Sequence, residues 1–250
     1  PVVTAAENVE QGTDEGSCTA EVVITDAEFG DNCSVASIEY ELSGATLGGG
    51  AGQAGTIIFN IGVTTITYTV TDAAGNTTTA EMTVTITDDE DPSVTAPADV
   101  TVSSDAGVCS AEVTIANATF TDNCTGSSLS YELSGATEVA GEGQVGEATF
   151  NVGVTTITYT VTDAAGNTAT AAMTVTVSDD EAPVITAPAD VTTTADDGSC
   201  EATGVALGDP VTSDNCEGEL TIENDAPESF PIGLTTITYT VTDINGNTAT

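Results

Sequence analysis

The chain has no lysine, arginine or histidine among its 250 residues, whereas aspartate and glutamate together number 40, which gives a formal net charge of −40. An ordinary soluble protein carries acids and bases in rough balance. Without cationic side chains nothing can pair with the phosphates of nucleic acids or anionic membranes, which excludes both as direct partners. Any cluster of carboxylates must therefore be solvated, protonated or neutralised by an external cation.

The usual catalytic side chains are missing as well. There is no histidine to act as a general base, no lysine or arginine to stabilise an oxyanion, and no Ser–His pair. Paired carboxylates could hydrolyse a glycoside, but here the acids recur in every copy of a repeat, at hinge positions. We therefore predict that the chain is not an enzyme.

Long apolar runs and tryptophan are also absent. No stretch approaches the roughly 20 apolar residues that a membrane-spanning helix needs. Aromatic residues are few, yet 39% of the residues are hydrophobic, and they are placed regularly along the chain. That fraction and that order are typical of a folded protein and argue against disorder.

One nine-residue string, TTITYTVTD, occurs three times, at 64–72, 155–163 and 235–243. The first cysteines of the copies (Cys18, Cys109, Cys200) are 91 residues apart, a period that fits one small domain. The third copy lacks the YELSGAT string of the others and stops before any counterpart of AAMTVTVSDDE, so we expect its final strand to be missing and the chain to be a window on a longer array. The predicted domains are 1–88, 89–179 and 180–250.

The repeated string alternates strictly between apolar and polar side chains. Ile66, Tyr68 and Val70 point one way and the threonines between them the other way, as in a half-buried strand. An AAGN turn follows, and the alternation continues to Ile86, which predicts a β-hairpin. Short strand-like runs separated by Gly, Asp, Asn and Pro, with no helical periodicity, predict an all-β antiparallel sandwich in each copy.

Each copy carries two cysteines, separated by 15, 15 and 16 residues. Six cysteines allow fifteen connectivities, of which pairing within each copy is the most economical. The alternatives are a metal site or free thiols, but two cysteines without histidine make a poor zinc site. Pairing within a copy would force the intervening segment to double back, because the two Cα atoms must lie within about 7 Å. The predicted bonds, which imply an oxidising compartment, are Cys18–Cys33, Cys109–Cys124 and Cys200–Cys216.

Several motifs together resemble the hyalin repeat (HYR) domain: GSC, DNC, FPIGLTTITYTVTD with its two variants, DAAGNT, and a closing D-D-E-x-P. The resemblance covers nearly the whole chain, three times over. It implies tandem immunoglobulin-like β-sandwich domains of an extracellular or cell-surface protein, in a family associated with cell adhesion.

Acidic residues concentrate between the copies, in DDED at 88–91 and DDE at 179–181. In an immunoglobulin-like domain the final hairpin turn lies beside the incoming linker, so the turn and the linker would offer several oxygen ligands to Ca²⁺. The predicted ligands are Asp88, Asp89, Glu90, Asp163 and Asn167 at one junction, and Asp179, Asp180, Glu181, Asp243 and Asn247 at the other.

Two questions about these acids stay open at the level of sequence. The aspartate and asparagine of a DxxGN turn commonly cap their own turn, and an acidic linker can be a solvated tether. The aspartates of the DNC loops are not assigned as ligands, because the disulfide constraint leaves their pole of the domain ambiguous; they are Asp31, Asp122 and Asp214.

We predict that the repeats are the structural stalk of a long extracellular surface adhesin or filament, stiffened by Ca²⁺ at the junctions. Its partners would be further copies of the repeat in a longer chain. The alternative is that the repeats themselves bind, either to a receptor or to one another, through the YELSGAT segment that the third copy lacks. Fold alone does not separate the two functions.

Overall fold

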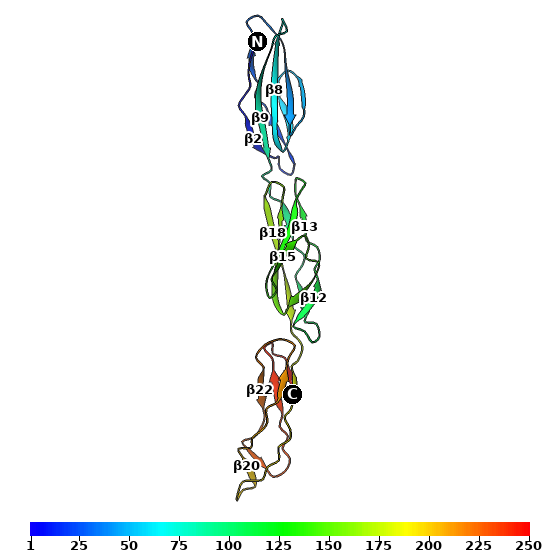
Figure 1. Cartoon of the computed structure of the whole chain (residues 1–250), viewed down its shortest axis with the longest axis vertical. Helices are drawn as coiled ribbons and strands as arrows, with labels where there is room; N and C mark the ends of the chain where they lie inside the picture. Colours follow the sequence, from blue (N-terminus) through cyan, green and yellow to red (C-terminus); the bar gives the residue numbers. More distant parts are fainter.

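The computed structural model describes all residues 1–250 and contains strands and loops only. Three units lie end to end in an elongated rod (Figure 1). No helix is present that could span a membrane. Unit 1 comprises β1 (Val2–Thr4), β2 (Val9–Gly12), β3 (Thr19–Val23), β4 (Glu28–Gly30), β5 (Val35–Gly44), β6 (Gly48–Ala51), β7 (Thr56–Asn60), β8 (Gly62–Asp72) and β9 (Thr77–Thr87).

Units 2 and 3 follow the same order, with losses in unit 3. Unit 2 comprises β10 (Ser93–Thr95), β11 (Val100–Ser103), β12 (Ser110–Thr114), β13 (Thr119–Thr121), β14 (Ser128–Gly135), β15 (Val139–Glu142), β16 (Glu147–Asn151), β17 (Gly153–Thr162) and β18 (Thr168–Ser178). Unit 3 comprises β19 (Val184–Thr186), β20 (Glu201–Thr203), β21 (Val211–Ser213), β22 (Thr221–Asn224), β23 (Ser229–Pro231), β24 (Tyr239–Thr242) and β25 (Thr248–Ala249).

Units 1 and 2 are β-sandwiches with the same topology. The larger sheet has five strands, in the order β2-β9-β8-β5-β6 in unit 1 and β11-β18-β17-β14-β15 in unit 2. The first strand of each order pairs in parallel with its neighbour, and the others pair antiparallel. The opposite layer is formed by the pairs β3-β7 and β12-β16. This architecture confirms the predicted all-β class of tandem immunoglobulin-like sandwiches.

The alternation of the repeated string places its apolar residues in the core. Ile66, Tyr68 and Val70 of β8 are fully buried, and Ile66 lies opposite the buried Met82 of the paired strand β9. The threonines between them lie on the outer face, where β-branched side chains favour the strand without adding charge. The predicted hairpin is therefore present, with its turn at the DAAGN sequence.

The first threonine of the string has a different role, because it points inward. The Thr64 hydroxyl is completely buried and accepts a hydrogen bond of 3.0 Å from the backbone N–H of Thr46. In unit 2 the Thr155 hydroxyl accepts the equivalent hydrogen bond from the backbone N–H of Thr137 at 3.1 Å. In unit 3 the YELSGAT segment that would supply the partner is absent, and the equivalent Thr235 is only half-buried.

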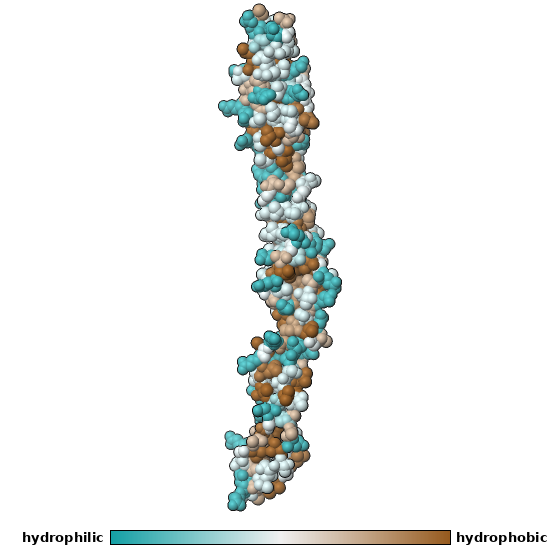
Figure 2. Space-filling model, in the orientation of Figure 1, coloured by the Kyte–Doolittle hydropathy of each residue, from teal (hydrophilic) through white to brown (hydrophobic).

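Unit 3 has an open core. It contains no counterpart of β18 beyond the two residues of β25, and the segment 191–194, which corresponds to β11, forms no strand. Ile237 and Tyr239 are partly exposed, whereas their counterparts in unit 2 are fully buried. A groove of about 840 Å³ lies along these residues, and apolar surface gathers over this unit in Figure 2.

Candidate metal centres and disulfides at the junctions

Each junction is built from three segments that the fold brings to one place. The linker enters the next unit at its N-terminal pole, where the final hairpin turn and the DNC loop also lie. At the first junction these segments place the carboxylates of Asp88, Asp122 and Asp163 within 4.8 Å of one another. At the second junction Asp179, Asp214 and Asp243 do the same.

The hairpin turn holds its aspartate rigidly. Asp163 Oδ1 accepts hydrogen bonds from the backbone N–H groups of Gly166 (2.6 Å) and Asn167 (2.7 Å), and Oδ2 accepts one from Asn167 Nδ2 at 2.8 Å. Burial pushes the pKa of Asp163 up, but these hydrogen bonds, foremost that from the Asn167 side chain, outweigh it and hold the pKa below its ordinary value. Asp163 therefore stays charged in the junction at neutral pH.

The same turn is joined to the linker. Asn167 Nδ2 donates to the backbone carbonyl of Asp88 at 3.1 Å, and Asn247 Nδ2 donates to that of Asp179 at 3.0 Å. The asparagine of DxxGN thus caps its own turn and also fixes the incoming chain. The sequence left metal binding and turn capping as alternatives for this motif; the structure shows the turn capping, and the same side chain also contacts the linker.

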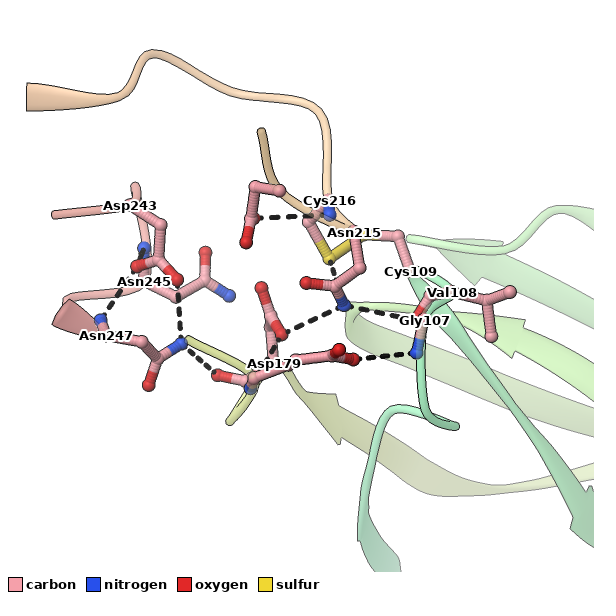
Figure 3. Close-up of a disulfide and its surroundings, with 11 residues drawn as sticks. Gly107, Val108, Cys109, Asp179, Asn215, Cys216, Asp243, Asn245 and Asn247 are labelled. Atoms are coloured by element: carbon pink, nitrogen blue, oxygen red, sulfur yellow. Dashed lines mark hydrogen bonds between the residues drawn. A yellow bond between two sulfur atoms is a disulfide. The ribbon is translucent and has the colours of Figure 1, made fainter. Parts of the chain in front are cut away.

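The DNC loop contributes more than the sequence indicated. Asn215 Nδ2 donates to Asp179 Oδ1 and to the backbone carbonyl of Val108 in the preceding unit, both at 3.2 Å. Asn123 makes the equivalent bonds at the first junction. Figure 3 shows Asn215 and the carboxylates of Asp179 and Asp243 around a common space beside the disulfide.

Several buried oxygens in this space have no hydrogen-bond partner. At the second junction they are Asp179 Oδ2, Asp214 Oδ1 and Asn215 Oδ1, and at the first Asp122 Oδ1 and Asn123 Oδ1. Asp179 is only 4% exposed. A buried carboxylate oxygen without a donor is costly, and with no lysine or arginine in the chain its compensation must come from water, a proton or an external cation. Oxygen donors of this kind suit Ca²⁺.

Four of the predicted ligands point elsewhere. Glu90 accepts a hydrogen bond from the N–H of Gly16 and Glu181 one from that of Gly107, so both glutamates face the preceding unit. Asp180 accepts from the Ser103 hydroxyl, and the Asp89 carboxylate lies against Gly12. These four side chains tie the linker to the unit it leaves and do not join the clusters.

The disulfide prediction was wrong in its pairing. The bonds join neighbouring units, Cys18 to Cys124 and Cys109 to Cys216, while Cys33 and Cys200 are free and exposed. The physical reason is that the GSC loop faces the following unit and the DNC loop the preceding one. The segment between the two cysteines of a unit, which includes β3, therefore crosses the sandwich from pole to pole and does not double back.

The sequence held one signal for this crossing. Ala20, Val22 and Ile24 are buried and alternate with the exposed residues Glu21 and Val23, as expected for a strand that runs the length of the sandwich. Such a strand separates Cys18 from Cys33. The aspartates of the DNC loops, omitted from the predicted ligands, then fall at the same pole as the hairpin turn.

The fold and the junctions define the class of protein: a rod of immunoglobulin-like β-sandwiches cross-linked end to end. The HYR domain model matches residues 1–86, 87–177 and 178–250. The chain therefore belongs to the HYR domain family, which confirms the resemblance seen in its motifs.

No curated protein sequence matches the chain. Among solved structures, Drosophila N-cadherin EC1-4 is similar with a TM-score of 0.35 and 16% identity, over 70% of this chain and 48% of that one. Mouse cadherin-23 EC22-24 gives 0.37 and 16%, over 98% and 94%. Protocadherin gammaB7 EC3-6 gives 0.37 and 14%, over 100% and 71%. The match thus spans about half the length of the N-cadherin chain, and the family membership of this protein rests on the HYR match.

Proposed function

We propose that the chain is a stalk segment of a long extracellular adhesin or filament, stiffened by one Ca²⁺ ion at each junction. The observation that carries this proposal is the pair of equivalent carboxylate clusters, each with buried oxygens that lack a donor. The ligands of the first site would be Asp88, Asp122 and Asp163, and those of the second Asp179, Asp214 and Asp243. Asn123 and Asn215 would each add an amide oxygen.

The positions of these ligands determine the mechanical effect of a bound ion. Each cluster takes one carboxylate from the linker and two from the following unit, and the disulfide beside it bonds that unit to the preceding one. A cation would neutralise three carboxylates that otherwise repel one another, and would hold the linker against the next sandwich. The units then act as one rod whose length grows with each copy, which is what a spacer requires.

The chemistry of the chain supports the same function. Inter-unit disulfides persist in oxidising, extracytoplasmic compartments, where Ca²⁺ is abundant. The net charge of −40 keeps neighbouring rods apart at low ionic strength. The lack of lysine and arginine also leaves no site for proteases that cut after those residues.

The test is small-angle X-ray scattering of the chain in millimolar Ca²⁺ and again in excess chelator, with melting curves in parallel. A clamped rod has a fixed maximum dimension in Ca²⁺, and chelation broadens the distance distribution and lowers the melting temperature. If scattering and melting are the same in both conditions, the acidic linkers are plain tethers and the metal assignment fails.

A further inference from the structure

The two inter-unit disulfides are connected by one short segment of unit 2. Cys124 lies at the N-terminal pole of this unit and is bonded to Cys18 of unit 1. Cys109 lies at the C-terminal pole and is bonded to Cys216 of unit 3. The segment 109–124 contains β12 and β13 and crosses the sandwich once. Covalent bonds therefore join unit 1 to unit 3 through a small part of unit 2.

This covalent path leaves out most of the chain. From one end to the other it consists of the segments 1–18, 109–124 and 216–250. These are about 70 residues, which extend to at most about 250 Å, whereas all 250 residues extend to about 900 Å. The stretches off the path include the long core hairpins β8-β9 and β17-β18 and both linkers.

At each junction the disulfide is a shorter tie than the linker. The Cα atoms of the bonded cysteines are 4.9 Å apart at the first junction and 4.7 Å at the second, and a disulfide allows at most about 7 Å. Each linker starts with a turn, in which the carboxylate of Asp88 or Asp179 accepts a hydrogen bond from the N–H two residues further on. The turn shortens the linker below its extended length of about 20 Å, so the disulfide becomes taut first.

The crossing segment is anchored along its length. β12 pairs with β16 over Ser110–Thr114, and β13 pairs with β10 over Thr119–Thr121, both antiparallel. Ala111 and Val113 of β12 are buried in the core of unit 2. Because the hydrogen bonds of these ladders are perpendicular to the strands, tension between the two cysteines of the unit loads them together in shear.

The crossing segment also has little length in reserve. Fully extended, it spans at most about 55 Å. β18 runs the length of the same sandwich with 11 residues, which span about 36 Å. Unit 2 can therefore lengthen by about 20 Å along this path, whereas a whole unfolded repeat would extend to about 300 Å.

We propose that the two disulfides and the segment 109–124 form the path that carries tension along the rod, and that this path limits how far the rod extends. This function goes beyond the metal clamp of the junctions, because a covalent path needs no cation. Asp88 and Asp179 lie in the linkers, off the path, so tension is not applied to the segments that bring these two ligands to the clusters. The rod therefore resists stretching while its junctions keep their geometry.

The experiment stretches single chains in optical tweezers, between handles joined to the two ends, without and then with a reductant. The oxidised chain should reach a final length of about 250 Å and the reduced chain about 900 Å. Cys124→Ser opens the first bond alone and Cys109→Ser the second, so each variant should reach about 520 Å. The matched controls are Cys33→Ser and Cys200→Ser, which remove free thiols and should stay at about 250 Å.

Two insertions test which segment carries the tension. Four glycines after Asn117, in the crossing segment, should lengthen the stretched oxidised chain by about 14 Å. The same glycines after Asp91, in the linker, should leave that length and the force of first extension unchanged. After reduction both insertions should add the same length, because the whole chain then lies on the path. The final lengths are set by covalent bonds, so a variant of lower stability still gives a readable result.

Three results would overturn the proposal. A final oxidised length of about 740 Å would show that the cysteines bond within their own units, and one of about 900 Å that no bond shortens the path. The third is a linker insertion that lowers the force at which the oxidised chain first extends. The proposed metal sites are tested separately, because the final lengths should be the same in Ca²⁺ and in chelator.

Discussion

The substitution Asp179→Asn separates the electrostatics of the second junction from its metal binding. Asparagine has nearly the same size and keeps an oxygen that can accept from Asn215, but it removes one of three negative charges that lie within 4.8 Å of one another. Each pair of unit charges at that distance repels by about 1 kcal/mol in a water-like dielectric. Asp179 takes part in two such pairs, so its removal relieves about 2 kcal/mol when no cation is present.

Calcium reverses the sign of this effect. At a free concentration of about 100 times the dissociation constant, one bound ion stabilises the folded state by about 2.7 kcal/mol. For a unit of this size that corresponds to roughly 10–20 °C in melting temperature. The substituted side chain is no longer a charged ligand, so the variant should forfeit most of this gain. It should therefore melt above the unsubstituted chain in chelator and below it in Ca²⁺.

Differential scanning calorimetry in both conditions measures this reversal. The matched control is Asp180→Asn, which removes the same charge from the same linker, but from a side chain bonded to Ser103 outside the cluster. The control should show no reversal. The reasoning is refuted if Asp179→Asn keeps the same order in both conditions, or if the two variants behave alike.

Three further predictions concern the units and their ties. Reduction of both inter-unit disulfides should lower the melting temperature measured by calorimetry. Each bond closes a loop of just over 100 residues and contributes up to about 4.7 kcal/mol to the free energy of unfolding in the chain-entropy model. An unchanged melting temperature would contradict this contribution. Thr64→Val should lower the free energy of unfolding in urea by about 1–3 kcal/mol, because it leaves a buried backbone N–H without an acceptor. Thr235→Val, at the same position of the repeat but without that partner, should leave the free energy of unfolding nearly unchanged. Equal losses in the two variants would contradict the role of the hydrogen bond. Two hydrogen bonds hold the pKa of Asp72 below its ordinary value of 3.8, the larger effect coming from the Asn76 side chain and the smaller from the Asn76 backbone N–H. The turn therefore stabilises the fold above pH 3.8 and loses this contribution as the pH falls further. Asn76→Ala should therefore melt lower than the unsubstituted chain near neutral pH and approach it in acid, and a gap that persists in acid would exclude this linkage.

The sandwich and its hairpin were predictable because their signals are local. In TTITYTVTD the side-chain period of two places Ile66, Tyr68 and Val70 in the core wherever the strand pairs, and the DAAGN turn fixes which strand follows. The same pattern occurs in all three copies of the repeat. The role of Thr64 was hidden, because its partner Thr46 is supplied by a distant segment.

The junctions were predictable only in part. The hairpin turn and the first linker acid were placed correctly beside each other by analogy with the immunoglobulin-like fold, as the contact between Asn167 and Asp88 shows. The pole at which the DNC loop lies depends on how often the chain crosses the sandwich between Cys18 and Cys33. No local sequence pattern predicts this number of crossings directly. A wrong pairing of cysteines therefore also removed Asp122 from the predicted ligands.

The number of calcium ions bound per chain tests the central claim most directly. Native mass spectrometry or equilibrium dialysis of the 250-residue chain should give two ions, one for each cluster. Asp88→Asn and Asp179→Asn should each reduce the number to one, and the double variant to none, while Asp89→Asn and Asp180→Asn should leave it at two. A chain that binds no calcium, or variants that all bind equally, would contradict the account of metal-clamped junctions.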